Sequence, residues 1–323
     1  MTAVPMLAKS VSGAHAWNAE SIAKVNVLGR FSDKAMKEIL AIAEKIEGLA
    51  DEDFDVKNFS VDALRKEVES ARDTHIDKGR GFVIFEGFPK SFTYIQARAG
   101  ILAVSQLLGE MIAQKQNGEL LREVKYRPEV EKKAQRYSDK KEGGDYHTDG
   151  AEIPPPLPKY LPLLCIRPAK EGGKFLVISS YEIHNRLLKE NPQALERLYK
   201  PFMWDMRDGK NTFEKPVFSY DGNSLTCTYL RSYINVGYQT AGKQMTDEDT
   251  AALDAMDKII EDLSMHFGVI MQSGQLMVSN NYTTIHGRTA FNDYDDEAKA
   301  RLLLRTWVCE KGAVPHGYNP YKK

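Results

Sequence analysis

The stretch that decides the fold covers residues 146–179 and reads YHTDGAEIPPPLPKYLPLLCIRPAKEGGKFLVIS. It holds two short apolar runs, 161–166 and 175–179, bounded by prolines and glycines, which is typical of β-strands. Similar runs recur further along the chain, at 216–220, 225–230, 269–272, 276–279 and 302–308. Many short strands with a few inserted helices predict a β-sandwich or barrel that is covered on one side.

Helical patterns fill the first third of the chain and interrupt the strands later. Apolar residues recur at helical spacing after Ser32, after Ser60 and over 94–112, and we expect further helices at 181–188, 193–199 and 247–267. The sequence has no internal repeat and no low-complexity linker. We therefore expect one domain over 1–323, with helical N-terminal decoration in 1–80, a strand-rich core with helical inserts in 81–308, and a C-terminal tail in 309–323.

Charge and cysteine usage exclude several classes of function. The 44 Lys and Arg residues nearly balance the 45 Asp and Glu residues, so no net field attracts nucleic acid or an anionic membrane. The three isolated cysteines, Cys165, Cys227 and Cys309, suit a reducing compartment, and no apolar run is long enough for a membrane span. These features predict a soluble, cytoplasmic protein whose partner is a small molecule.

The most informative triplet is His147-Thr148-Asp149. Side chains two apart in a strand point to the same face, so this imidazole and carboxylate can reach one metal ion. A hydrogen-bonded surface pair in a loop is the alternative interpretation, since the bare motif occurs often by chance. A second histidine would complete a set of two histidines and one carboxylate that leaves positions open on iron.

Context favours His286 as that second histidine, because it follows a strand in the segment NNYTTIHGR (280–288). The alternatives are in charged helical stretches, near the termini or at a helix end, where a histidine complements the helix dipole. They are His15, His75, His184, His266 and His316.

These residues, in this order, resemble the taurine dioxygenase and clavaminate synthase-like superfamily of iron(II)/2-oxoglutarate oxygenases. The resemblance covers 81–308: the segment GFVIFEGFP (81–89), the HTD triplet, LCIRPA (164–169) with Gly172-Gly173, KPVF (215–218), GQL (274–276) and HGR (286–288). It implies a double-stranded β-helix, or jelly roll, with His147, Asp149 and His286 as both the catalytic residues and the ligands of Fe(II). It also implies 2-oxoglutarate and O₂ as cosubstrates.

The distal carboxylate of 2-oxoglutarate needs a fixed cation, and arginine pairs with a carboxylate through two parallel bonds. Arg301 and Arg305 flank three leucines and point to one face if 301–308 is a strand. By resemblance, Arg301 binds the cosubstrate and Arg305 the organic substrate. In the alternative interpretation both are exposed helix residues paired with nearby acids.

One feature departs from the family pattern. Relatives usually carry a threonine after the Gly-Gly pair, whereas this chain has Lys174-Phe175. Either Lys174 supplies a second cation, or other groups hold the carboxylate, or a different 2-oxoacid is used. Two segments, 125–144 and 153–156, are candidate lids over the site, and Tyr146, Arg231, Asn281 and Arg288 are candidates to line its pocket.

The expected activity is hydroxylation of an unactivated C–H bond in an amino acid or related small metabolite, with succinate and CO₂ as coproducts. Desaturation, epoxidation and cyclisation are alternative outcomes of the same chemistry. A metal-binding jelly-roll protein without redox function, or a zinc hydrolase that uses the same three ligands, is the alternative of a different class.

Overall fold

The computed structural model describes residues 5–89, 91–130, 136–315 and 318–322. The α-helices are α1 (Ala19–Ile22), α2 (Asp33–Ala43), α3 (Asp62–Ala71), α4 (Tyr94–Leu108), α5 (Ser180–Glu190), α6 (Pro192–Leu198), α7 (Arg231–Thr240) and α8 (Asp247–Ile260). The strands are β1 (Leu28–Arg30), β2 (Phe82–Glu86), β3 (Gly109–Ile112), β4 (Leu121–Val124), β5 (Gly144–His147), β6 (Tyr160–Arg167), β7 (Glu171–Gly172), β8 (Phe175–Ser179), β9 (Phe202–Asp205), β10 (Thr212–Lys215), β11 (Phe218–Tyr220), β12 (Leu225–Cys227), β13 (His266–Val269), β14 (Leu276–Asn280), β15 (Thr284–Arg288), β16 (Phe291–Asn292) and β17 (Leu302–Glu310).

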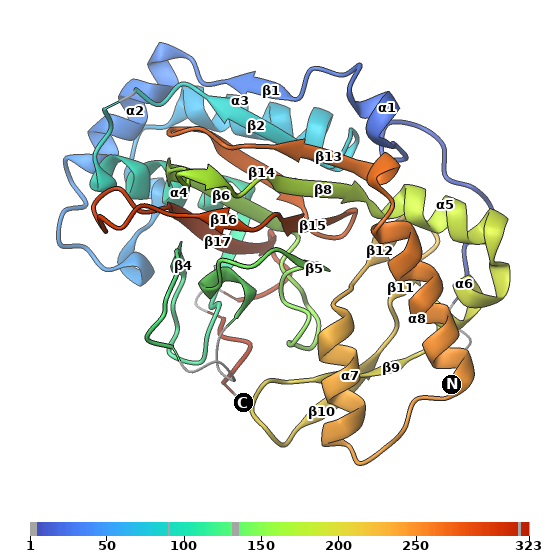
Figure 1. Cartoon of the computed structure of the whole chain (residues 1–323). Coiled ribbons are helices and arrows are strands. Elements are labelled where there is room, and N and C mark those ends of the chain that lie inside the picture. Colours follow the sequence, from blue (N-terminus) through green and yellow to red (C-terminus); the bar gives the residue numbers. More distant parts are fainter. Residues whose placement is uncertain (1–4, 90, 131–135, 316–317, 323) are drawn as a thin grey trace.

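Two sheets form the core (Figure 1). The larger has the order β1-β2-β14-β6-β17-β3, with β4 also paired to β17, and the smaller has the order β13-β8-β15-β5. Neighbouring strands within each sheet are antiparallel apart from the β1-β2 pair. The two sheets share an apolar interior, with Phe82, Ile84 and Met277 from the larger sheet against Val177 from the smaller one. The predicted jelly roll is confirmed.

Side chains along β17 point alternately to the two faces of the larger sheet. Leu303 is buried in the interior between the sheets, whereas Leu304 and Val308 pack on the opposite face. Because side chains alternate along a strand, Arg301 and Arg305 share the interior face with Leu303. The predicted strand, with both arginines on one face, is therefore correct, and the interpretation as an exposed helix is wrong.

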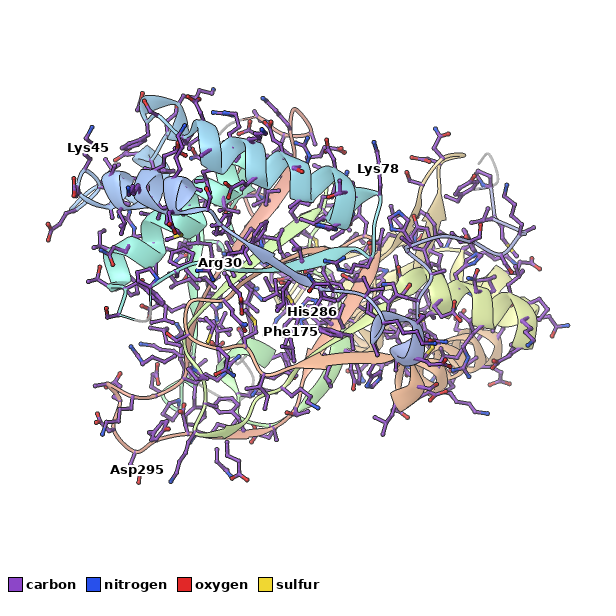
Figure 2. The ribbon with its side chains drawn as sticks, turned by 90° about the horizontal axis from the view of Figure 1, so that it is seen from above. Arg30, Lys45, Lys78, Phe175, His286 and Asp295 are labelled. Carbon is purple, nitrogen blue, oxygen red and sulfur yellow. The ribbon has the colours of Figure 1, made fainter. Side chains whose placement is uncertain are left out.

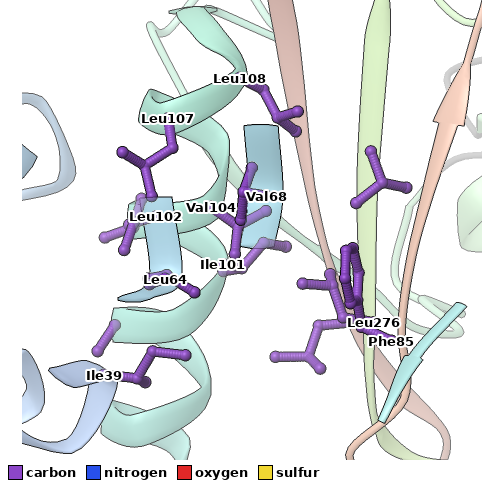
Figure 3. Close-up of a cluster of buried hydrophobic side chains, with 14 of the residues drawn as sticks. Ile39, Leu64, Val68, Phe85, Ile101, Leu102, Val104, Leu107, Leu108 and Leu276 are labelled. Carbon is purple, nitrogen blue, oxygen red and sulfur yellow. The ribbon is translucent and has the colours of Figure 1, made fainter. Parts of the chain in front are cut away.

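The outer face of the larger sheet is covered by α2, α3 and α4, which lie along one side of the molecule (Figure 1). Figure 3 shows the apolar side of α4, with Ile101, Val104 and Leu108, facing Leu276 and Phe85 on the sheet. Thr93 starts α4 with a capping box, since its hydroxyl accepts from the Gln96 backbone and the Gln96 side chain accepts in return. This layer holds rigid the sheet that carries the arginines.

The structure corrects several boundaries predicted from the sequence. The segment 94–112 is helical only to Leu108, and 109–112 pair as β3 with β17. The predicted helix 247–267 ends at Ile260, and its last residues form β13, which covers 266–269 and not 269–272. In both places the helical spacing of the apolar residues continues into a short strand. The spacing alone therefore did not show where the helix ends and the strand begins. Helix α7 was not predicted.

Among the described residues, no helix combines the length and the apolar character that crossing a bilayer requires.

Leu276 tests the packing of the central strand. It is fully buried between α4 and the sheet, so Leu276→Ala is expected to lower the free energy of unfolding by about 2–5 kcal/mol. Urea unfolding followed by circular dichroism measures this, with Leu263→Ala as control, because Leu263 is 79% exposed. Equal stability of the two variants would contradict the assignment of Leu276 to the core.

Candidate metal centre and substrate cavity

Two neighbouring strands of the smaller sheet carry the histidines of the candidate metal centre. His147 is the last residue of β5 and His286 lies in the middle of β15, and the two are direct partners in the antiparallel register. Side chains of directly opposed residues share a face, and the two imidazole rings lie with centroids 4.4 Å apart. The pairing of β5 with β15 therefore selects His286 from the candidate histidines.

Asp149 completes the cluster from the turn after β5, not from the strand itself. The ligand atoms of His147, Asp149 and His286 all lie within 4.8 Å of one another, and all three side chains are buried. Nε2 of His147 is 3.7 Å from Oδ1 of Asp149, and Nε2 of His286 is 3.9 Å from Oδ2. These separations exceed a hydrogen bond and fall below about 4.2 Å, twice a typical bond from a metal to nitrogen or oxygen.

The hydrogen bonding and protonation of the three side chains also fit a metal site. Oδ2 of Asp149 is buried and has no hydrogen-bond partner among the described residues. A buried carboxylate oxygen without a partner is costly, and a bound cation removes that cost. Burial lowers the pKa of His286 to about 3, so its ring is neutral at pH 7, the form that coordinates a metal.

Arg305 and Asn281 hold Asp149 in place. Nη1 of Arg305 donates to Oδ1 of Asp149 at 3.0 Å, and Nε donates to the side-chain oxygen of Gln114 at 2.9 Å. The Asn281 side chain accepts from the Asp149 backbone N–H and donates to its carbonyl, both at 2.8 Å. Burial is the largest influence on the pKa of Asp149 and raises it, but the combined effects of Arg305, His286, His147 and Trp307, with Arg305 the largest of these, hold that pKa below its ordinary value.

Arg301 lies in the same inner cavity as the three ligands. This cavity measures about 60 Å³ and is lined by Arg301, Arg305, the three ligands and apolar residues including Leu163, Phe175 and Met277. Arg301 is only 6% exposed, and in the described part of the chain its guanidinium makes no ion pair within 4.0 Å. Burial and the nearby charge of Arg288 lower the pKa of Arg301 to about 10, so it remains cationic at pH 7.

Lys174 and Phe175, which replace the usual threonine region, lie on opposite faces of their sheet. Lys174 is exposed, and its side chain lies against Gly268 of β13, so it supplies no second cation to the inner cavity. Phe175 faces inward and stacks on His286 with ring centroids 5.4 Å apart; both are labelled near the middle of the molecule in Figure 2. The ring fixes the plane of the imidazole and closes this wall of the cavity to water.

A larger cavity of about 540 Å³ opens on the other side of His147 and Asp149. Its size is that of a small-molecule site. Arg305 and Trp307 of β17 form part of its wall together with Leu230, Tyr233 and Val236 of the α7 region. The charged residues of the wall, besides Asp149 and Arg305, are Arg136, Lys140, Glu152, Asp205 and Arg207.

The candidate lid 125–144 contributes to this cavity through residues 136–138 and 140, whereas 131–135 lie outside the described residues. Asp139 anchors it, because Oδ1 accepts from Arg122 at 2.7 Å and from Arg127 at 2.9 Å. Arg288 donates to the carbonyls of Lys140 and Glu142 at 2.9 and 2.8 Å. The second candidate lid, 153–156, does not line this cavity.

The other residues predicted to line the pocket have different places. Arg288 lines the inner cavity, whereas Asn281 acts on the backbone of Asp149. Tyr146 contacts His266 with ring centroids 5.2 Å apart, and Arg231 pairs with Asp254 and Asp257, both at 2.9 Å. Neither of them lines the two cavities.

Sequence reasoning missed Gln114, Glu152, Asp205 and Arg207. Gln114 lies in a loop after β3, and nothing in its local sequence links it to Arg305. The only available signal for Asp205 and Arg207 was the alternation Trp204-Asp205-Met206-Arg207, in which apolar and charged residues alternate at the end of a short strand. No local pattern singled out Glu152.

Comparison with known proteins agrees with this geometry. Residues 42–307 match the profile of the family described as taurine catabolism dioxygenase TauD, TfdA family. The chain is 27% identical over 319 residues to FR-33289 synthase of Streptomyces rubellomurinus, covering 94% of this chain and 92% of that one.

Solved structures share the fold. Asparagine oxygenase in complex with Fe(II), hydroxyasparagine and succinate superposes with a TM-score of 0.69 at 18% identity, over 88% of this chain and 93% of that one. The iron oxygenase OrfP with Fe and α-ketoglutaric acid gives a TM-score of 0.64 at 14% identity, over 87% and 93%. With its jelly-roll core and the profile match over most of its length, the chain belongs to the TauD, TfdA family of dioxygenases.

Proposed function

We propose that this dioxygenase binds iron(II) through His147, Asp149 and His286, uses 2-oxoglutarate and O₂, and hydroxylates an unactivated C–H bond of an amino acid or related small metabolite. The observation that carries the proposal is the place of Arg301 in the same inner cavity as the ligand cluster, where it is a buried cation with no carboxylate partner among the described residues. A hydrolytic zinc site or a passive metal site has no need of such a cation beside its ligands.

Two histidines and one carboxylate leave adjacent positions on iron for the cosubstrate and O₂. The chemistry supplied there is oxidative decarboxylation of 2-oxoglutarate to succinate and CO₂, in which one atom of O₂ enters succinate and the other the substrate C–H bond.

The residues of the chain bind and orient the cosubstrate and the organic substrate, and they exclude water from the site. Arg301 pairs with the distal carboxylate of 2-oxoglutarate, while Leu163, Phe175 and Met277 keep the inner cavity dry and strengthen that ion pair. Arg305 borders both cavities, so it can hold Asp149 and also donate to an acceptor atom on the organic substrate.

The relatives support an amino acid substrate and an alcohol product. Asparagine oxygenase was solved with 3-hydroxyasparagine, and OrfP with (3S)-hydroxy-L-Arg, each together with succinate. Hydroxylation is therefore proposed ahead of desaturation, epoxidation and cyclisation.

Anaerobic spectroscopy tests the proposal. Addition of iron(II) and 2-oxoglutarate to the metal-free protein is expected to give the weak visible charge-transfer band of a chelated 2-oxoacid. A screen of succinate release over amino acids and small acids then finds the substrate. Tight retention of zinc without the band would support the hydrolase or passive metal site instead.

Arg305→Ala is expected to raise the KM for the organic substrate about tenfold or more, with a smaller change in the 2-oxoglutarate requirement. The reason is the loss of a charge-assisted donor worth about 1.5–3 kcal/mol. Weaker iron binding is expected too, since Asp149 loses its hydrogen bond from Nη1. Steady-state kinetics and an iron titration measure the two effects.

Arg305→Lys serves as the matched variant, because it keeps the charge and loses the planar fork. An effect of Arg305→Ala confined to 2-oxoglutarate would show that the roles of Arg301 and Arg305 are exchanged.

A further inference from the structure

The charges in the wall of the larger cavity are unequally compensated. Glu152 is paired, since its Oε1 lies 2.8 Å from Nη1 of Arg136 and 3.1 Å from the hydroxyl of Tyr321. Asp149 is held by Arg305 in the same way at 3.0 Å. Three charged residues of the wall, Lys140, Asp205 and Arg207, make no ion pair within 4.0 Å among the described residues.

Asp205 is a buried carboxylate with no cationic side chain beside it among the described residues. It is 8% exposed, and in the described part of the chain no Lys, Arg or His nitrogen lies within 4.0 Å of its carboxylate. Burial raises the pKa of Asp205, although a hydrogen bond from the Arg207 backbone and the positive charge of the Arg207 side chain oppose the shift. A cationic partner stabilises the ionised form of a buried carboxylate more than a neutral hydrogen bond does, and the cavity is where such a partner can enter.

Arg207 presents the opposite charge to the same cavity. Its Nη1 donates to the hydroxyl of Tyr233 at 2.8 Å, and within the described residues it makes no ion pair within 4.0 Å. Its backbone has φ of 57°, in the left-handed region that costs energy for a residue with a Cβ. Backbone strain of this kind concentrates at ligand sites, where the surrounding structure holds it.

The hairpin that carries both residues is fixed on α7. β9 and β10 pair in register, and Nε1 of the buried Trp204 donates to the Lys215 carbonyl at 2.9 Å. Gly237 of α7 lies so close to this strand that a Cβ there would come within 2.5 Å of the Met203 carbonyl oxygen. The charged pair is therefore positioned by packing before any ligand binds.

A metal ion does not explain Asp205. Among the described residues, the only group of three metal-ligating side chains is the His147, Asp149 and His286 cluster. Asp205 and Arg207 carry opposite charges, are two residues apart in the sequence and face one cavity; Lys140 adds a second positive charge that is unpaired among the described residues.

We infer that this enzyme recognises a zwitterion, with an ammonium group of the substrate on Asp205 and its neighbouring carboxylate or other anionic group on Arg207. This inference rests on the proposed function and narrows its substrate class to compounds with both charges, such as the head group of a free amino acid. The opposite end of the substrate then extends past Arg305 toward the metal centre. Blocking either charge removes one of the two ion pairs.

The test compares free α-, β- and ω-amino acids with their N-acetyl derivatives and their methyl esters. Two quantities are measured: succinate release above the rate without substrate, and calorimetric binding to protein loaded anaerobically with iron(II) and 2-oxoglutarate. At least one free amino acid is expected to bind and stimulate release, and its blocked forms to do so at least about tenfold less well.

Asp205→Asn and Arg207→Gln are expected to raise the KM for that amino acid about tenfold or more. The change in kcat should be smaller, because the two ion pairs form at the end of the substrate that is remote from the reacting bond. Asp205→Asn should also reduce the discrimination against the N-acetyl derivative, and Arg207→Gln that against the ester. Lys210→Gln is the matched control in the same loop, because Lys210 is exposed and does not line the cavity, and we expect little change in this variant.

Failure of the inference differs from failure of the proposed function. If neither the 2-oxoacid band nor substrate-free succinate release is seen, the oxygenase proposal fails. If both are seen but blocked derivatives equal free amino acids, or no zwitterion binds, the zwitterion site is overturned while the oxygenase proposal stands. Unchanged kinetics in Asp205→Asn and Arg207→Gln would also overturn it.

Discussion

Replacing His147, Asp149 or His286 with alanine is expected to abolish iron-dependent succinate formation, with a loss of more than 100-fold for each. The three ligand atoms lie within 4.8 Å of one another, and no other such cluster occurs in the described residues, so no side chain can take over. Loss of a residue that only supports a ligand typically costs about 10- to 100-fold, and loss of the ligand itself should exceed this.

The measurement pairs succinate release with direct titration of iron(II), so that a binding defect is separated from a catalytic one. Circular dichroism should show a folded protein, because the ligands face a cavity and contribute less to packing than core residues do. His75→Ala is the matched control, since His75 lies near Arg80 and outside both cavities. Full activity of any one triad variant would remove that residue from the proposed metal centre.

Arg301→Ala is expected to raise the apparent KM for 2-oxoglutarate about 10- to 150-fold, which corresponds to the loss of about 1.5–3 kcal/mol from a charge-assisted pair. The effect should be specific to the cosubstrate, because Arg301 lines the inner cavity and not the larger one. The affinity for 2-oxoglutarate is measured without turnover by following the intensity of the anaerobic charge-transfer band as the 2-oxoglutarate concentration is raised.

Arg301→Lys should recover part of the affinity, since lysine keeps the charge but not the bidentate fork. Arg30→Ala, at an exposed position, controls for the general loss of an arginine. An unchanged KM for 2-oxoglutarate in Arg301→Ala would assign the distal carboxylate to a different group.

The sequence by itself predicted those features that depend on local periodicity. Short apolar runs predicted β6, β8, β14 and β17, and strand alternation placed Arg301 and Arg305 on one face with Leu303, as the structure has them. The two-residue spacing of His147 and Asp149 predicted one shared ligand pair, which the structure brings together although Asp149 lies beyond the end of β5. Such patterns are visible because side-chain direction in a strand follows from the backbone alone.

Only the tertiary structure decided which distant residues meet. The register of β5 against β15 placed His286 opposite His147, and the packing of β17 beside the β3 loop gave Arg305 its contacts with both Gln114 and Asp149. The positions of Asp205 and Arg207 in the cavity wall depend on how the β9-β10 hairpin packs against α7. The backbone of β9 approaches α7 closely at Gly237. These contacts join segments far apart in the chain, and their formation depends on how whole elements pack, which no local spacing encodes.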